Sequence, residues 1–226
     1  KTITATGSGA PSLKAANVAA ARLGAERAAK MDAFGNIIES VKGVRINSGE
    51  TAADLMSNDP QVKAKVEGII RGFKVLDTKY YSDGGVDLIV QVPLDGVLTG
   101  TLLPNAGSKT AAAGDAGGIT GIIINAKGLK ATPALAPRIL DDKGNAIYAA
   151  ELVKSDAVTS HGVCSYEKSM DAAMKDKRVA DKPLIVKAMK LASKGGSDLV
   201  VSAADAAKLQ KAGSVLADGK VVIVVD

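Results

Sequence analysis

The first forty residues show two hydrophobic periods in succession. Thr2–Thr6 alternates threonine with apolar residues and stops at Gly7-Ser8-Gly9, a pattern typical of a short strand followed by a turn. From Ser12, which can cap a helix, alanine-rich sequence continues without a proline to Val41. A single long amphipathic helix is therefore predicted after the first strand.

One face of this helix is predicted to hold its apolar side chains. At about 100° per residue, these positions share one side: Leu13, Ala16, Ala20, Leu23, Met31, Phe34, Ile38 and Val41. The small residues Ala16 and Ala20 suit close approach to a sheet or another subunit and are candidate interface residues. Phe34 and Ile38 are expected to fill the core against the sheet, and Gly43 to end the helix at positive φ.

Arg27 falls inside this apolar stripe, between Leu23 and Met31. Its aliphatic stem can cross the face while the guanidinium reaches the rim. Alternatively, it forms an ion pair with a carboxylate of a neighbouring strand or subunit, an arrangement that fixes register. The second interpretation makes Arg27 a third interface candidate.

The hydrophobic pattern then predicts a small sheet. Val44–Ser48 is strand-like, and two short helical segments follow. A Ser-Asp-Gly-Gly turn joins the strands Ile69–Tyr81 and Val86–Leu94. Apolar residues alternate along the second of these strands, so one of its faces is expected to be buried. Residues 1–98 are therefore predicted to form a β-α-β-(α)-β-β unit with the long helix packed on the sheet.

The rest of the chain predicts a second, mixed α/β unit. Residues 99–118 are rich in Gly and Ala and are interpreted as a linker or loop. Residues 119–226 then mix strand and helix patterns, with a helix predicted at Ser165–Lys177 and a fully apolar, sheet-central strand at Val221–Val225. The predicted class is α/β (α+β), with units at 1–98 and 119–226.

Composition narrows the possible partners. Hydrophobic residues make up 46% of the chain and aromatic residues only 3%, so the core must be aliphatic. The net charge of +5 is unclustered and lacks interleaved aromatic rings, which argues against a nucleic-acid partner. No apolar run approaches the roughly 18 residues that span a bilayer, so no transmembrane segment is predicted.

Few residues offer catalytic chemistry. His161 and Cys164 are the single His and Cys, and three residues of separation in a loop is poor geometry for a dyad. A metal site there needs further ligands from elsewhere. Gly7-Ser8-Gly9 stands between a strand and a helix, where an anion-binding turn can form, but lacks the third glycine of that motif. No catalytic, cofactor-binding or metal-binding residue is predicted, and the chain is not expected to be an enzyme.

The first unit resembles a known family. The stretch T-A-T-G-S-G, followed by R-L-G-A-E-R-A-A-K-M-D-A-F-G-N-I-I-E-S-V-K-G-V-R-I, is similar to the envelope lipoprotein family that includes the flagellar disk protein FlgP. The family core is matched over residues 2–97 at Arg27-Ala28-Ala29, Asp32-Ala33, Glu39 and Gly43, while Gly35-Asn36 stands where the family often has Arg-Asn. The stretch from Gly118 to Ala150 resembles a module that follows this domain in related envelope proteins.

The resemblance implies export, a place near the outer membrane, self-assembly into rings or polymers, and no catalysis. Partners are then other copies of the chain and other envelope or flagellar components. Mature lipoproteins begin with Cys, whereas this chain begins with Lys1, which we interpret as a mature chain whose signal peptide has been removed. A bacterial protein that is periplasmic, outer-membrane-associated or secreted is expected.

Two functions follow as hypotheses. The first is a non-enzymatic structural protein that assembles into homo-oligomeric rings or filaments. The alternative is a binding module for an anionic envelope polymer such as a polysaccharide, using basic residues of the second unit, with Lys127, Lys130 and Arg138 as candidates.

Overall fold

The computed structural model describes residues 2–109, 114 and 116–226. The chain divides into two compact units. Unit 1 holds the residues up to Val44 together with Ala52–Leu94, and unit 2 holds Arg45–Thr51 together with Asp95–Asp226. Unit 1 thus extends to Leu94, and a seven-residue segment inside its sequence belongs to unit 2.

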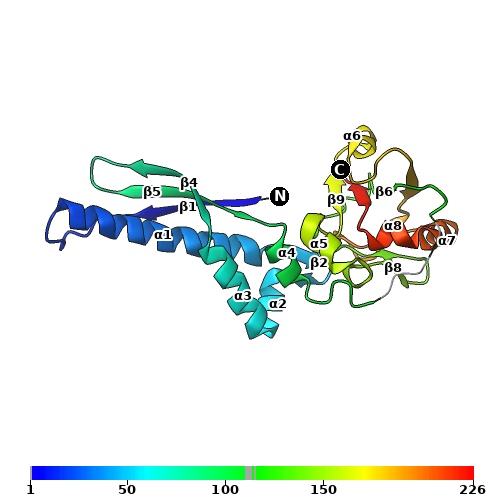
Figure 1. The fold of residues 1–226 in the computed structure, drawn as a ribbon, viewed down its shortest axis with the longest axis horizontal. Helices are drawn as coiled ribbons and strands as arrows, with labels where there is room; N and C mark the ends of the chain where they lie inside the picture. The colour runs from blue at the N-terminus through cyan, green and yellow to red at the C-terminus, as the bar shows by residue number, and fades with distance from the viewer. Residues whose placement is uncertain (1, 110–113, 115) are drawn as a thin grey trace. The chain divides into compact units, whose positions relative to one another are not determined.

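Unit 1 is a three-stranded antiparallel sheet with one long helix lying along it (Figure 1). The strand order is β1-β5-β4, so β5 is central. Its elements are β1 (Thr2–Gly9), α1 (Val18–Lys42), α2 (Ala52–Asn58), α3 (Pro60–Arg71), β4 (Lys74–Tyr80) and β5 (Val86–Pro93). The predicted hairpin turn and the alternation along its second strand are confirmed, because β4 pairs with β5 and Val86, Leu88, Val90 and Val92 are all buried. The start of the predicted strand Ile69–Tyr81 was wrong, because Ile69–Arg71 form the end of α3.

Helix α1 packs on the sheet through small residues at every fourth position. Its buried residues are Ala25, Ala29, Ala33, Ile37 and Val41. Opposite them, a Cβ placed on Gly7 would lie 2.2 Å from the Ala29 carbonyl oxygen, and one on Gly9 would lie 1.9 Å from that of Ala25. Gly7-Ser8-Gly9 is therefore part of β1, where the two glycines admit the helix backbone, and not a turn after it.

The predicted apolar face of the helix was wrong over most of its length. Leu23 and Met31 are 56% and 76% exposed, and Phe34 and Ile38 are only half-buried. Each step of four residues advances about 40° around a helix. The buried stripe consequently winds around α1, lying opposite the predicted face at Ala25 and meeting it only at Val41.

The ends of α1 also differ from the prediction. The helix begins after Asn17, whose side-chain oxygen accepts the N–H of Ala20 at 2.8 Å, and not after Ser12. Gly43 follows the last turn with φ −71°, an ordinary right-handed helical value, so the expected positive φ is wrong. The chain leaves the helix there without needing a left-handed residue.

Unit 2 contains two four-stranded sheets and a small hairpin. The first sheet is parallel, in the order β10-β6-β13-β9, and the second is mixed, in the order β11-β12-β7-β8. The strands are β2 (Arg45–Asn47), β3 (Glu50–Thr51), β6 (Gly121–Asn125), β7 (Ile139–Leu140), β8 (Ala146–Tyr148), β9 (Ser165–Glu167), β10 (Pro183–Lys187), β11 (Lys190–Leu191), β12 (Leu199–Val200) and β13 (Val221–Val224). As predicted, the last apolar strand is internal to its sheet.

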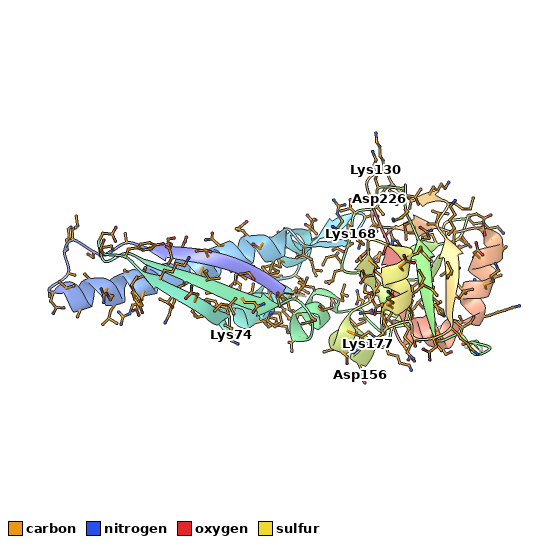
Figure 2. The ribbon with its side chains drawn as sticks, turned by 90° about the horizontal axis from the view of Figure 1, so that it is seen from above. Lys74, Lys130, Asp156, Lys168, Lys177 and Asp226 are labelled. Atoms are coloured by element: carbon orange, nitrogen blue, oxygen red, sulfur yellow. The ribbon has the colours of Figure 1, made fainter. Side chains whose placement is uncertain are left out.

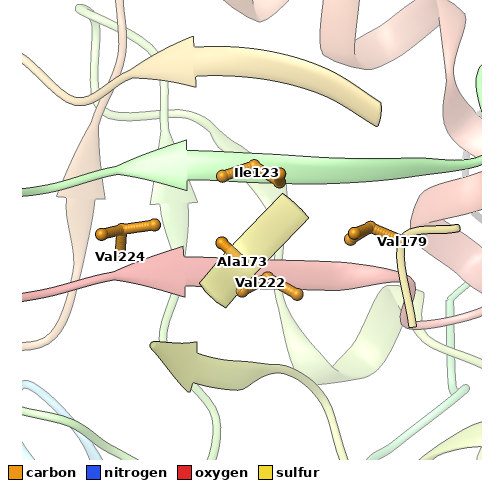
Figure 3. Packing of buried hydrophobic residues seen from close by; sticks show 5 residues of the cluster. All are labelled: Ile123, Ala173, Val179, Val222 and Val224. Carbon is orange, nitrogen blue, oxygen red and sulfur yellow. The ribbon is translucent and has the colours of Figure 1, made fainter. Parts of the chain in front are cut away.

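Short helices complete unit 2. They are α4 (Val97–Leu102), η1 (Ala150–Leu152), α5 (Ser155–His161), α6 (Met170–Lys175), α7 (Ala203–Lys211) and α8 (Gly213–Ala217). Ala173 of α6 packs over the parallel sheet with Ile123 and Val222, in a cluster that also includes Val179 and Val224 (Figure 3). This aliphatic core agrees with the low aromatic content of the chain.

Two sequence-based predictions for unit 2 need correction. The helix predicted at Ser165–Lys177 is strand β9 followed by α6, because Ser165–Glu167 pairs with β13 and Ser169 caps the helix. The predicted linker at 99–118 begins inside α4, where Leu98 and Leu102 are buried. Positions 110–113 and 115 of that predicted linker lie outside the described residues.

Candidate functional site

The outer side of α1 presents the apolar residues that the sheet does not cover. Leu23 and Met31 are the large apolar side chains on this side; Val18, at the first position of α1, is 78% exposed but lies about 140° around the helix from both. Ala20 and Arg27, two of the interface candidates, are exposed with them, and Ala16 is exposed just before the helix begins. The structure thus brings Ala20, Leu23, Arg27 and Met31 together on one solvent-facing side, since these positions lie within about 80° of one another on a helix.

Arg27 therefore does not lie over a buried stripe. Other arginines of unit 1 contact aromatic rings instead: the Arg22 guanidinium carbon lies 5.4 Å from the centre of the Tyr80 ring, and that of Arg71 lies 5.7 Å from the centre of the Phe34 ring. Such cation–π contacts tie α1 to β4 through Arg22 and α3 to α1 through Arg71. Arg27 remains a charge within an exposed apolar face, as is typical of a protein interface.

A second group of exposed apolar side chains follows β4, which sequence reasoning had treated only as a hairpin partner. Val75, Leu76, Tyr80 and Tyr81 are each exposed by more than a third. The Tyr80 hydroxyl donates to Glu26 Oε1 at 3.1 Å, and that of Tyr81 donates to Asp87 Oδ2 at 2.7 Å. These bonds raise the pKa of both tyrosines, and the bond from Tyr81 lowers the pKa of Asp87. The sequence signal that could have revealed this surface is the pair of tyrosines at the end of the predicted strand Ile69–Tyr81.

In unit 2, Lys127 and Lys130 occupy one loop that Asp226 organises. Asp226 Oδ1 accepts the N–H of Gly128 at 2.8 Å, and Oδ2 accepts that of Lys130 at 2.9 Å, so Lys130 and Asp226 lie together (Figure 2). The bonds from Gly128 and then Lys130 hold the pKa of the Asp226 carboxyl below its ordinary value. Lys130 adopts φ 55°, a left-handed conformation that this pair of bonds supports.

A shallow hollow of about 550 Å³ adjoins this loop. It is lined by Lys127, Gly128, Leu129, Lys187, Ala188, Met189 and Asp205. The carboxylate of Asp205 is held by Lys208 Nζ at 2.8 Å, which lowers the pKa of Asp205. Two lysines beside a neutralised carboxylate leave the hollow with a positive rim, which suits an anionic ligand.

Arg138 has a different role from the two lysines. Its Nε and Nη2 donate to Asp198 Oδ2 at 2.9 and 2.6 Å, and its backbone N–H donates to Asp198 Oδ1 at 3.0 Å. Asp198 is fully buried. The three anionic-polymer candidates therefore do not act alike, because the guanidinium of Arg138 is committed to a carboxylate of its own unit.

The side chains of His161 and Cys164 lie in different surroundings. Nε2 of His161 lies 3.0 Å from the carbonyl oxygen of Asp218, whereas the thiol of Cys164 is buried. Among residues 2–109, 114 and 116–226, no three His, Cys, Asp or Glu side chains gather as a metal site would require. No helix in the same described ranges is long and apolar enough to cross a membrane.

With this geometry established, unit 2 can be compared with known proteins. Residues 121–226 match the family model described as the second domain of Treponema pallidum Tp0624. The match begins at the first residue of β6 and includes every later element of the unit, so this part of the chain is similar to a bacterial domain. No curated protein matches the chain.

Proposed function

We propose that the chain is a non-enzymatic structural protein of the bacterial envelope or cell exterior that assembles with copies of itself into rings or filaments. The outer side of α1 supports this proposal most directly. A 25-residue helix whose alanines pack against its own sheet leaves Leu23 and Met31 exposed on its outer side. Exposed apolar residues grouped on one face mark an interaction surface.

Two similarities support the bacterial and envelope parts of the proposal. Residues 121–226 are similar to a domain of a Treponema protein. Over residues 2–97, the resemblance to the envelope lipoprotein family that includes FlgP points to a periplasmic, outer-membrane-associated or secreted protein. Envelope or flagellar components are then its proposed partners besides itself.

Sedimentation of the purified full chain tests self-assembly. Species much heavier than the 22.9 kDa monomer are expected at micromolar concentration. Leu23→Glu combined with Met31→Glu places two charges on the outer side of α1 and is expected to reduce assembly. Gln61→Glu with Ala64→Glu, on the exposed side of α3, is the matched control. A native chain that stays monomeric, or equal behaviour of the two variants, contradicts the proposal.

The positive hollow of unit 2 favours a second candidate function, the binding of an anionic envelope polymer. Polygalacturonate, a polymer of uronic acids, is a suitable probe in a salt-dependent titration. Lys127→Ala with Lys130→Ala is expected to weaken binding and flatten its salt dependence, because two cations leave the hollow and its loop. Unchanged binding by this double variant would rule the site out.

A further inference from the structure

The sheet of unit 1 has two edges, and α1 closes one of them. Along β1, the N–H of Ser8 donates to Asp32 Oδ2 at 2.8 Å, and the Thr6 carbonyl accepts from Asn36 Nδ2 at 2.8 Å. Both backbone groups point away from β5, and both are satisfied by helix side chains. No further strand can bond to this half of β1 without displacing them.

The other edge is β4, and its outward groups follow from alternation. The N–H of Tyr81 donates to the Gly85 carbonyl across the hairpin turn, so Tyr81 faces β5. Backbone groups of an antiparallel strand alternate between its two sides. Tyr80 and Thr78 therefore direct their N–H and C=O groups outward, and the Thr78 N–H bonds to the Asp77 carboxylate at 2.9 Å.

We propose that two copies of the chain join through β4, with Leu76–Tyr80 of one copy antiparallel to the same segment of the other about a two-fold axis at Thr78. This inference rests on the proposed self-assembly and names the surface that makes the first contact. The outward N–H of Thr78 then exchanges the carboxylate of its own Asp77 for the C=O of the second Thr78, which leaves Asp77 able to pair across the new interface. The bulge that inserts Leu76 and the hairpin turn after Tyr81 limit the pairing to this segment.

The charges of β4 select this register. With Thr78 opposite Thr78, Asp77 of each copy lies opposite Lys79 of the other, and two ion pairs form. A shift by one residue pair in one direction places Asp77 opposite Asp77, and a shift in the other places Lys79 opposite Lys79. Like charges directly opposite destabilise a strand pair, so both neighbouring registers are disfavoured.

The apolar side chains fit the same register. Leu76 and Tyr80, which are 48% and 54% exposed, lie opposite each other across the two-fold axis. Tyr80 pairs with Val86 of β5 and contacts α1 through Glu26, so it projects on the helix side of the sheet. Asp77 and Lys79 pair with Ile89 and Asp87 and project on the other side. The apolar contacts of the new strand pair thus lie on the helix side of the sheet, and its ion pairs lie on the other side.

Because the Thr6–Ser8 half of β1 is occupied by helix side chains, we place the contact between the β4 strands of both copies, which gives a closed dimer with one continuous sheet. Further growth into a ring or filament then requires a different surface, a role that the outer side of α1 can fill. In this proposal, β4 forms the dimer first, and the outer side of α1 then joins dimers into a larger assembly.

Charge reversal tests the register on the full chain. Asp77→Lys and Lys79→Asp, each alone, place like charges opposite each other twice and are expected to weaken dimerisation at least tenfold by sedimentation. The double variant, which exchanges the two charges, is expected to recover most of the affinity. Lys74→Glu, beyond the bulge in the same strand (Figure 2), is the control and is expected to dimerise normally. Equal affinity in both single variants, or no recovery in the double variant, overturns the proposed register.

Thr78→Pro provides an independent test, because it removes an outward N–H that β5 does not use. Proline is tolerated on such an edge position. A monomer with native circular dichroism and thermal melting is expected. If the native chain assembles and Thr78→Pro assembles equally well, β4 pairing is wrong while self-assembly stands. If the native chain never associates, the proposed function fails first, so the two failures are distinguishable.

Discussion

The guanidinium of Arg138 holds the carboxylate of Asp198 in a two-pronged contact, with donor–acceptor distances of 2.9 and 2.6 Å to one oxygen. Asp198 is fully buried and the Arg138 side chain is half-exposed. Ser48, from the β2–β3 hairpin, completes the site by accepting the backbone N–H groups of Ser197 and Asp198 at 2.9 Å each. The ion pair and the two hydrogen bonds to Ser48 together link three separate segments of unit 2.

Replacing Arg138 with Ala is expected to destabilise unit 2 by about 3 kcal/mol, because it leaves a buried carboxylate without its cation. Urea unfolding followed by circular dichroism measures this. Lys130→Ala, which removes an exposed amino group, is the control and is expected to change the free energy of unfolding by less than about 0.5 kcal/mol. A negligible loss in Arg138→Ala would show that solvent replaces the guanidinium.

Gly7→Ala is expected to destabilise unit 1 by roughly 1–3 kcal/mol or more, since the new methyl group overlaps the α1 backbone at Ala29 and Ala33. Gly35→Ala is the matched control. Gly35 lies on the open side of α1, where the added Cβ meets no neighbouring element within 4 Å. Because alanine is favoured over glycine inside a helix, Gly35→Ala is expected to raise the free energy of unfolding by about 0.5–1 kcal/mol. Thermal melting of both variants distinguishes the effect of close packing at Gly7 from the effect of helix propensity at Gly35. Equal shifts in melting temperature would contradict the close packing of Gly7 against α1.

Ile37→Ala is expected to destabilise unit 1 more than Phe34→Ala, although phenylalanine has the larger side chain. Ile37 is fully buried beneath α1, so Ile37→Ala is expected to cost about 2–5 kcal/mol. Phe34 is half-buried with its ring against Arg71, and Phe34→Ala is expected to cost less. Chemical denaturation of the two variants checks the order. The opposite order would mean that the predicted helix face, and not the observed one, packs on the sheet.

The Asp226 contacts predict a response to acid in the Lys127–Lys130 loop. Because the folded pKa of Asp226 is lowered, its contribution to stability is complete above the ordinary value of 3.8 and is lost as pH falls through the folded pKa, below 3.8. NMR titration is expected to show the Asp226 carboxyl and the amides of Gly128 and Lys130 changing together in that range. A midpoint at or above 3.8, or independent changes of the amides, contradicts the contact.

The features predicted correctly from sequence were those with local causes. The alternation Val86–Val92 and the Ser-Asp-Gly-Gly turn identified the hairpin of β4 and β5. The uninterrupted apolar strand at Val221–Val225 identified the middle of a sheet. Each of these signals lies within a few residues of the structure that it predicts.

The errors had distant causes. The face of α1 was assigned by side-chain size, but the distance between the helix and β1 is set by Gly7 and Gly9, to which only alanines such as Ala25 and Ala29 can fit. Ser165–Glu167 is a strand only because β13 lies beside it. Of the candidate site residues, Lys127 and Lys130 are only three positions apart in sequence, whereas the partner of Arg138 stands sixty positions away.

The β2–β3 hairpin has a consequence for the order in which the protein is made. Ser48 is synthesised 149 positions ahead of Ser197, to whose N–H it bonds, a delay of roughly 7–30 s at typical ribosome speeds of about 5–20 residues per second. Once Pro93 has been made, unit 1 has all its strands, while Ile46, which is buried in the folded chain, still lacks the segments of unit 2 that follow Asp95. A fragment that stops at Leu94 keeps this apolar residue in water permanently. The contacts of Ser48 can form only after Ser197 and Asp198 have been translated.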